Sequence, residues 1–344
     1  MRPQLPTVEQ VRPWLEAMDA SHTFSNFGPL VRELETRHAQ RLRVAPEQVV
    51  SIANATLGLM GAVAQSQATN WVVPAFTFPA SAHAVLAANK DLEFRDINPD
   101  TWLLETGDVV GNSGIMPVMP FGASIDLAPW LNYKHVVIDA AASLGARHVD
   151  LSDLPQSWVV VFSLHATKVL PAGEGGLAVF GDIDSARDFR AWTNFGFAGT
   201  RMSRMPSINA KMSEITAAYG LASLDNWGTE SRDWQTAHEQ AQLINTVFGL
   251  SSPVELTTGV HPYWIVQTDS SEERDQMEEQ LRSADIETRR WWPVSLPEMP
   301  AFNQWPIETP HAKHAASTSV GLPMYRGLRT TDFESIRTAL HYLH

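Results

Sequence analysis

The chain has 344 residues, 44% of them hydrophobic, and a formal net charge of -13. That length predicts one large domain and a smaller one, each with its own core. The acidic balance disfavours nucleic acid and anionic membrane as partners, and the absence of cysteine excludes disulfides and thiolate metal sites.

The N-terminal sequence MRPQLPTVEQ lacks the apolar core of a signal peptide. No apolar run approaches the ~20 residues that would span a bilayer. We therefore expect a cytoplasmic protein that does not enter the membrane.

Strand-like and helix-like segments alternate over the first ~240 residues, which is typical of an α/β fold with a mainly parallel central sheet. Pro29 starts a helix over 30–42, Asn54 caps a second and Pro79 opens a third that runs to about residue 89. The predicted strands are 49–52, 71–73, 92–95, 115–119, 136–138, 159–162 and 177–180.

A long helical stretch over 212–248 is expected to lead into a second, smaller α/β domain. There we predict a strand at 262–268, a helix at 271–283 and a strand at 286–290. The expected division is a large domain over 1–240 and a small C-terminal domain over 241–344.

The stretch FSLHATKVLPAGEGG, residues 162–176, places Lys168 between an apolar strand and a glycine-rich turn. A lysine beside a turn is usually a solvated surface charge, and Lys90 and Lys134 fit that description. Lys168 has mostly apolar neighbours, and such a setting favours the neutral amine, a nucleophile toward carbonyl compounds. The stretch therefore suggests that Lys168 forms a Schiff base.

Four groups follow strand-like runs, where open α/β sheets bind their ligands. They are the turn of Asn54, Ala55 and Thr56, the turn ending in Phe78, the carboxylate of Asp139, and Ser163. Each has an ordinary structural explanation, since Asn54 and Asp139 can cap helices and Phe78 can lie in the core. Together with Lys168, however, they suggest pyridoxal 5'-phosphate, with its phosphate at a helix N-terminus and its ring nitrogen facing a carboxylate.

The chain resembles the DegT/DnrJ/EryC1/StrS sugar aminotransferases, which are fold-type I pyridoxal phosphate enzymes. The resemblance is carried by stretches in family order over most of the chain. They include NATLGL (54–59), VVPAFTFPASAHAVLAA (72–88), VVIDAAASLGA (136–146), FSLHATKVLPAGEGGLAVF (162–180), SINAKMSEITAAYGLASL (207–224) and TRRWWPV (288–294). The serine-x-histidine-x-x-lysine pattern followed by GEGG is the most specific of them.

The resemblance implies roles around the cofactor ring. Lys168 corresponds to the lysine that bonds the cofactor, Asp139 to the partner of the ring nitrogen, and Phe78 to the residue that stacks on the ring. Two of these, Lys168 and Asp139, are implied to be catalytic.

The resemblance also implies the phosphate ligands. Thr56, the backbone of Ala55, and Ser163 correspond to ligands within the chain. Asn209 corresponds to a ligand that the family donates from the neighbouring subunit, which implies a homodimer with shared active sites.

The chain departs from the family pattern at several positions. Ala55 replaces a common glycine, and Ala142 stands where many members have a glutamine that contacts the ring hydroxyl. Either another group or water takes over that hydrogen bond. Ala210 replaces a frequent tyrosine, and the pair Ser295 and Leu296 replaces a Leu-His pair on the expected substrate side.

The implied activity is transfer of an amino group from L-glutamate to a nucleotide-linked keto-deoxysugar, for polysaccharide biosynthesis or for secondary-metabolite sugars. Four arginines are candidates for binding the donor carboxylate or the diphosphate, although each can also be a solvated surface residue. They are Arg201, Arg204, Arg289 and Arg290.

Three alternatives remain at the level of the sequence. A pyridoxal phosphate-dependent sugar dehydratase has histidine in place of the lysine, so Lys168 argues against it. In a non-catalytic regulator or scaffold with this fold, Lys168 and Asp139 would have no catalytic role. A nicotinamide-dependent dehydrogenase is disfavoured because no G-x-G-x-x-G follows a strand.

Overall fold

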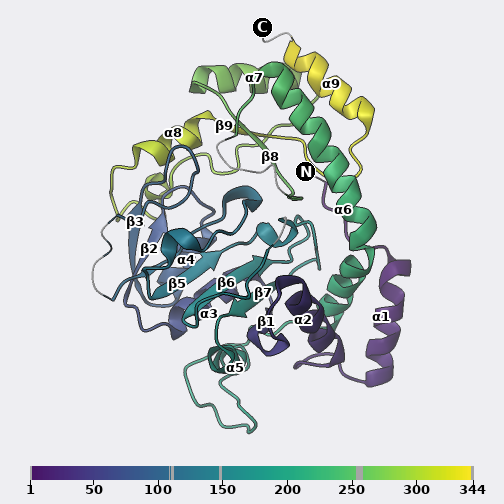
Figure 1. Ribbon diagram of the computed structural model, residues 1–344, viewed down its shortest axis with the longest axis vertical. Coiled ribbons are helices and arrows are strands. Elements are labelled where there is room, and N and C mark those ends of the chain that lie inside the picture. The colour runs from purple at the N-terminus through teal and green to yellow at the C-terminus, as the bar shows by residue number, and fades with distance from the viewer. Residues whose placement is uncertain (1, 108, 110–111, 147–148, 253–258, 342–344) are drawn as a thin grey trace.

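A seven-stranded sheet forms the centre of the fold, and a two-stranded sheet lies beside it in the C-terminal part (Figure 1). The computed structural model describes residues 2–107, 109, 112–146, 149–252 and 259–341. Its strands are β1 Val49–Ile52, β2 Asn70–Pro74, β3 Asp91–Arg95, β4 Gly114–Ile115, β5 His135–Asp139, β6 Trp158–Ser163, β7 Gly176–Phe180, β8 Trp264–Gln267 and β9 Ser319–Leu322.

Helices occupy both sides of the large sheet and most of the C-terminal part. The α-helices are α1 Val8–Ser21, α2 Pro29–Leu42, α3 Ala55–Gln65, α4 Ala80–Ala87, α5 Ile183–Trp192, α6 Glu214–Phe248, α7 Ser271–Ser283, α8 Pro310–Thr318 and α9 Thr330–Leu340. Short 3₁₀ turns lie at Pro46–Gln48, Pro120–Gly122, Ala128–Trp130, Ser143–Gly145 and Leu296–Glu298.

The large sheet has the strand order β1-β7-β6-β5-β4-β2-β3. Strand β7 is antiparallel to both of its neighbours, β1 and β6, and every other pair is parallel. Six strands therefore point the same way, and β7 alone starts at the edge where they end. The expected mainly parallel sheet is confirmed.

Successive residues of the central strands belong to different cores, because side chains alternate between the two faces of a sheet. Val72, Val136 and Val160 lie in the core shared with α1, α2 and α6. Val73 and Val137 lie in the core shared with α3, α4 and α5. Burial on both faces explains why these strands read as continuous runs of valine and isoleucine.

Helix α6 spans 35 residues and runs from the large sheet to the C-terminal elements (Figure 1). Its second half contributes Trp234, Ala237, Ala241 and Ile244 to a third core, built with β8, β9, α7 and α9. The predicted boundary at residue 240 falls inside this helix, so the two-domain division stays a prediction.

Some predicted elements differ from the observed ones. The expected strand at 286–290 is wrong, because that segment forms only an isolated bridge between Arg289 and Gly321. The strand expected over 115–119 is reduced to Gly114–Ile115, followed by a bridge from Val118 to Asp139. The helix at 271–283 is confirmed, while α1, α5, α8, α9 and β9 were not predicted.

The described helices include none that combines the length and the hydropathy needed to cross a bilayer.

A buried ion pair joins α2, β1 and α5. The Glu35 carboxylate is 3.0 Å from two guanidinium nitrogens of Arg190 and accepts hydrogen bonds from the backbone and hydroxyl of Ser51. Arg190 also donates to the Val49 carbonyl. Because both charges are compensated by several partners, this pair fixes β1 against its helices without leaving a buried charge unpaired.

The buried imidazole of His38, on α2, makes stability depend on pH. Its pKa is lowered to about 3, first by burial and then by the charges of Arg41 and Arg37. The unfolded chain binds this proton near pH 6.5, so the stabilisation is complete above that pH and is lost as the pH falls toward the folded value. At pH 5 the loss is about 2 kcal/mol, because 1.5 pH units cost about 1.36 kcal/mol each.

We expect His38→Leu to flatten the pH dependence of the free energy of unfolding between pH 6.5 and 5, as measured by urea unfolding. His311→Gln changes an exposed histidine on α8 and should leave the slope as in the unmodified protein. Burial also lowers the pKa of His238 to about 4, so this residue should preserve part of the slope in both variants. Equal slopes for the protein and His38→Leu would contradict this role for His38.

Candidate functional site

The residues that the sequence selected converge on one edge of the large sheet. The parallel strands β1, β2, β5 and β6 all end there. The Asn54 turn follows β1 and the Phe78 turn follows β2, while Asp139 and Ser163 are the last residues of β5 and β6. Ends of adjacent strands are tied together, since the Ser163 amide donates to the Ala141 carbonyl at 3.3 Å. This edge is where α/β sheets present their ligand sites.

Asp139 is a buried carboxylate, with 5% of its surface exposed. The Ser81 hydroxyl donates to Oδ2 at 2.7 Å, and the Ala141 amide donates to Oδ1 at 3.1 Å. Burial raises the pKa of Asp139, while these two hydrogen bonds and the charge of Lys168 act in the opposite direction. A cation placed against this carboxylate would offset the cost of burying it.

Ser81 belongs to a short chain of buried hydroxyls. The Thr77 and Ser81 hydroxyl oxygens are 3.1 Å apart, and Ser81 has a single proton, which it donates to Asp139. Thr77 must then donate to Ser81. The Ser81 amide also donates to the Phe78 carbonyl at 3.2 Å, so one turn at the start of α4 carries Phe78 and supports Asp139.

Lys168 lies on the loop between β6 and β7 and is half-buried, not enclosed as its apolar neighbours suggested. Its Nζ donates to the Tyr263 hydroxyl at 2.9 Å. The glycine-rich turn holds this loop, because the Ala166 amide donates to the Gly173 carbonyl at 2.8 Å. Gly173 has φ +89° and Gly175 φ +138°, conformations that a residue with a side chain rarely adopts.

The first turn of α3 offers free amides next to β7. Asn54 caps the helix by accepting from the Leu57 amide at 3.0 Å, which leaves the amides of Ala55 and Thr56 without a partner inside the helix. A Cβ at Gly176 would lie 2.9 Å from the Ala55 nitrogen, so only glycine lets β7 pass this close. The Thr56 side chain is exposed.

Ser163 lies at the end of β6 and pairs with Gly176 of β7, which also pairs with Ile52 of β1. Its oxygen accepts from the His165 amide at 3.2 Å, and its proton stays available for an acceptor. The ends of β1 and β6 are therefore held on either side of β7, which brings Ser163 to the side of the site where α3 begins.

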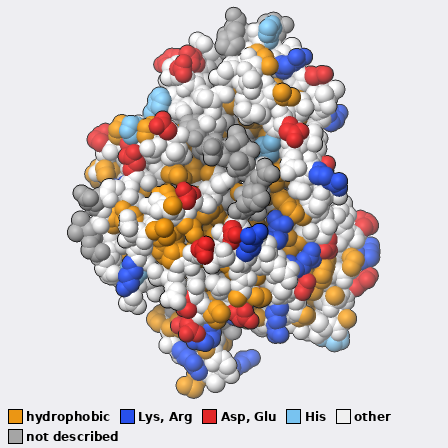
Figure 2. Space-filling model, in the orientation of Figure 1, with side chains coloured by type: hydrophobic (Ala, Val, Ile, Leu, Met, Phe, Trp, Pro, Cys, Tyr) orange, Lys and Arg blue, Asp and Glu red, His pale blue; other side chains and the backbone are white. Residues whose placement is uncertain are grey.

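Phe78 and Asn209 are exposed in the single chain. The Phe78 side chain is 61% exposed, and hydrophobic side chains gather on the visible face over α4, β5 and β6 (Figure 2). The Asn209 carboxamide accepts from Lys211 at 2.7 Å, while the next residue, Ala210, accepts from the Ala53 amide at 2.8 Å. This backbone hydrogen bond of Ala210 holds Asn209 near the Asn54 turn of its own chain.

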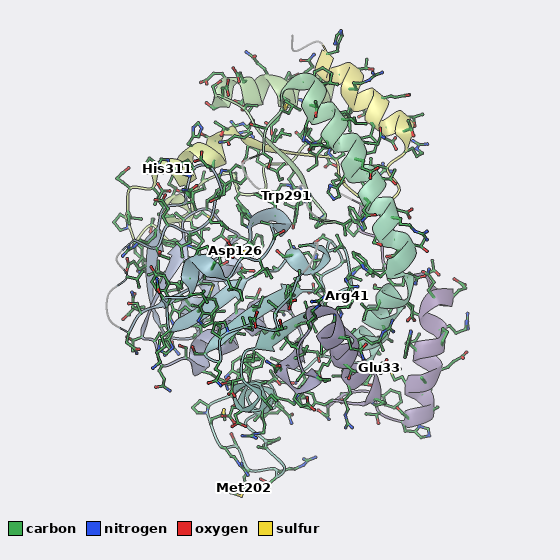
Figure 3. The ribbon with its side chains drawn as sticks, in the orientation of Figure 1. Glu33, Arg41, Asp126, Met202, Trp291 and His311 are labelled. Atoms are coloured by element: carbon green, nitrogen blue, oxygen red, sulfur yellow. The ribbon has the colours of Figure 1, made fainter. Side chains whose placement is uncertain are left out.

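The four candidate arginines lie in different surroundings. Arg290 forms ion pairs with Asp275 and Glu278, and Arg201 and Arg204 are exposed on the loop whose tip is marked by Met202 in Figure 3. Arg289 lies 5.0 Å from the ring of Trp291, which is 4.9 Å from the ring of Tyr263. Of the four, Arg289 is the one connected to Lys168 by a series of contacts, which runs through Trp291 and Tyr263.

Comparison with known proteins identifies the chain. A model of the DegT/DnrJ/EryC1/StrS aminotransferase family matches residues 7–341. The chain belongs to this family. It is therefore an aminotransferase, its cofactor is pyridoxal 5'-phosphate, and the resemblance noted from the sequence is confirmed.

Individual relatives cover nearly the whole chain. The dTDP-4-amino-4,6-dideoxy-D-glucose transaminase of Shigella dysenteriae is 28% identical over 97% of this chain and 96% of its own. The GDP-perosamine synthase of Caulobacter vibrioides is 27% identical over 95% and 93%. Among solved structures, DesI with its TDP-sugar product has a TM-score of 0.86 and 28% identity, covering 99% of this chain and 91% of its own.

The residues of the site fit the family's cofactor. The buried Asp139 carboxylate has no hydrogen-bonded cation among the described residues, which suits a protonated ring nitrogen. The free amides of α3 and the Ser163 hydroxyl suit a phosphate. No group of three or more metal-binding side chains occurs within the described part of the chain.

Two residues of the site escaped the sequence reasoning. Ser81 is separated from Asp139 by 58 positions, and Tyr263 from Lys168 by 95. Ser81 carried a weak signal, because it lies three residues after Phe78, at the start of a helix. Tyr263 carried none, since its contact depends on how β8 lies against the large sheet.

We expect Ser81→Ala to weaken cofactor binding about 10-fold, because a hydrogen bond to a charged group is worth about 1.5–3 kcal/mol and only part of it acts on the ring nitrogen. Equilibrium dialysis of pyridoxal phosphate measures this affinity. Ser81→Thr keeps the hydroxyl and should restore binding. Ser143→Ala removes a nearby buried hydroxyl that donates to Ala123 and should have no effect. Equal affinity in Ser81→Ala and the unmodified protein would contradict the support of Asp139 by Ser81.

Proposed function

We propose that this aminotransferase moves an amino group from L-glutamate to the keto group of a deoxysugar linked to a nucleoside diphosphate. The proposal is carried by the positions of Lys168, on the loop between β6 and β7, and of Asp139, at the end of β5. Both lie at one edge of the sheet, beside the free amides of α3. The curated relatives, which act on dTDP-, GDP- and UDP-linked sugars according to their names, support the substrate class.

The proposed roles of the site residues follow from their contacts and positions. Asp139 would keep the ring nitrogen of the cofactor protonated, and Phe78 would cover one face of the ring. The amides of Ala55 and Thr56, with the hydroxyls of Thr56 and Ser163, hold the phosphate. The bound cofactor supplies an electron sink for the carbon that exchanges its amino group.

Lys168 acts as the proton carrier in this proposal. Its Nζ would accept the proton from the donor carbon and, in the second half of the reaction, would donate a proton to the sugar carbon that receives the amine. A flexible side chain on a half-buried loop can make this short movement while its backbone stays fixed by the His165 carbonyl, which accepts from the Lys168 amide at 2.9 Å.

The proposed acceptor side is lined by aromatic rings. Tyr263 contacts Phe121 and Trp291, and Phe121 stacks on Trp292 with ring centroids 4.2 Å apart. Trp291, which lies between the C-terminal elements and the large sheet in Figure 3, carries Arg289 over its ring. Arg289 makes no ion pair within the described ranges, so we propose that it binds the diphosphate or the donor carboxylate.

Replacement of the lysine tests the proposal. Lys168→Ala should lower the rate of 2-oxoglutarate formation from glutamate and a nucleotide keto-sugar by at least about 100-fold, because the proton carrier is lost. Lys134→Ala, at an exposed lysine, should keep the rate. A panel of dTDP-, UDP- and GDP-linked keto-sugars, with NMR of the product, identifies the nucleotide and the aminated carbon. A bound cofactor whose spectrum ignored glutamate would contradict the donor assignment.

We further propose a homodimer in which Asn209 completes the phosphate site of the partner subunit. Exposed apolar side chains on the Asn209-bearing loop, Phe195 at 46% and Met202 at 73%, support a contact between copies. The loop projects away from the body of the single chain at the bottom of Figure 3, where Met202 is labelled.

A mixed dimer decides whether Asn209 acts across the interface. When Lys168→Ala and Asn209→Ala chains are co-expressed with different tags, each purified hybrid contains one fully native site if Asn209 crosses to the partner. The hybrid should then show about half of the wild-type rate, as expected for a two-fold symmetric dimer. If Asn209 serves its own chain, the hybrid contains no native site and its rate should not exceed that of the Asn209→Ala protein.

A further inference from the structure

The Tyr263 hydroxyl is the hydrogen-bond partner of the Lys168 amine, at 2.9 Å. Tyr263 directly precedes β8, so it reaches the site from the C-terminal part of the chain. Its side chain is buried, and its ring packs edge-to-face against Phe121 at 5.5 Å and Trp291 at 4.9 Å. These contacts from two sides fix the ring, and with it the direction of the hydroxyl.

The segment that carries Tyr263 runs beside the segment that carries Ala142. The Val260 amide donates to the Gly145 carbonyl at 3.0 Å, and Ala146 bridges to Gly259. Gly122 lies between the two segments, because a Cβ built on it would lie 3.0 Å from the Ala142 oxygen and 2.7 Å from Cβ of His261. The segment that leads into Tyr263 therefore lies beside the segment of position 142, where the chain has only a methyl group.

We propose that Tyr263 donates its hydroxyl proton to the ring oxygen of pyridoxal phosphate, and thereby supplies the polar contact that Ala142 cannot make. In the cofactor the ring hydroxyl and the aldehyde are on adjacent ring carbons, so a group that contacts the lysine nitrogen lies beside the ring oxygen as well. When Lys168 is free, the same hydroxyl holds its amine. The inference rests on the proposed role of Lys168 as the lysine that bonds the cofactor.

The direction of the expected effect follows from the chemistry of the ring oxygen. While the lysine nitrogen bonded to the cofactor carries a proton, that proton stabilises the negative ring oxygen. Once the proton is lost, the Tyr263 hydroxyl is the remaining donor, so it favours the deprotonated form. Removing the hydroxyl should therefore raise the pH at which this nitrogen titrates.

The first measurement is the pH titration of the visible absorption band of the holoenzyme. In Tyr263→Phe the midpoint should move upward by about one pH unit, a 10-fold change in the equilibrium, because the lost hydrogen bond is charge-assisted. The phenylalanine ring keeps the packing against Phe121 and Trp291. Tyr133→Phe, in which the removed hydroxyl donates to the Gly107 carbonyl at 3.3 Å, is the matched control and should leave the midpoint in place.

The second measurement uses the protein without cofactor. Reductive methylation of Lys168 by formaldehyde and cyanoborohydride, followed by mass spectrometry, reports how firmly the amine is held. Tyr263→Phe should accelerate this methylation roughly 3- to 10-fold, because a net hydrogen bond restrains the amine. Lys134 in the same sample is the internal reference and should react at an unchanged rate.

A second-site replacement tests the link to position 142. Ala142→Gln introduces a side-chain amide next to the same ring oxygen, so the double variant Tyr263→Phe/Ala142→Gln should return the titration midpoint toward that of the unmodified enzyme. A purely structural role of Tyr263 would not be rescued in this way, since the glutamine adds no packing around Phe121 or Trp291.

The outcomes separate this inference from the proposed function. An unchanged midpoint in Tyr263→Phe would overturn the donation to the ring oxygen, and an unchanged methylation rate would overturn the restraint of the amine. If the unmodified holoenzyme showed no band that borohydride fixes on Lys168, the proposed role of Lys168 would fail instead. An upward shift that Ala142→Gln reverses would support the assignment.

Discussion

The site depends on a single constraint, which is that six strands of the large sheet point the same way. Because the ends of β1, β2, β5 and β6 meet at one edge, residues more than one hundred positions apart in the chain face the same space. The reversed strand β7 starts at that edge, and its first residue, Gly176, lets α3 approach closely. Parallel pairing, rather than any single side chain, therefore creates the place where the chemistry occurs.

At that edge, several groups offset the free-energy cost of burying the Asp139 carboxylate. Asp139 is a carboxylate removed from water, which is unfavourable unless hydrogen bonds and a cation compensate for it. Ser81 and Ala141 supply the hydrogen bonds, and we propose that a protonated ring nitrogen of the cofactor supplies the cation. The turn at the start of α4 links Asp139 to Phe78, so this carboxylate and this aromatic side chain are positioned by one local structure.

The C-terminal part of the chain enters the same site through Tyr263. Its hydroxyl contacts Lys168, its ring contacts Trp291, and Trp291 lies beneath Arg289. The cofactor side and the proposed substrate side are thus joined by a continuous series of contacts. If Tyr263 donates to the ring oxygen as proposed, replacements at Ala142 and Tyr263 should influence each other, because both act on the same oxygen of the cofactor.

The sequence by itself determined the family, the parallel strands and the candidates at their ends. These features depend on local patterns, such as a valine run followed by Asp139, or Lys168 before a glycine-rich turn. Only the tertiary structure decided which residues support them. Ser81 and Tyr263 act across 58 and 95 positions, and the solvation of Lys168 and Phe78 depends on packing that no local pattern encodes. The strand predicted at 286–290 was wrong for the same reason, because its one apolar residue, Ile286, packs against the third core and the segment forms only the bridge from Arg289 to Gly321.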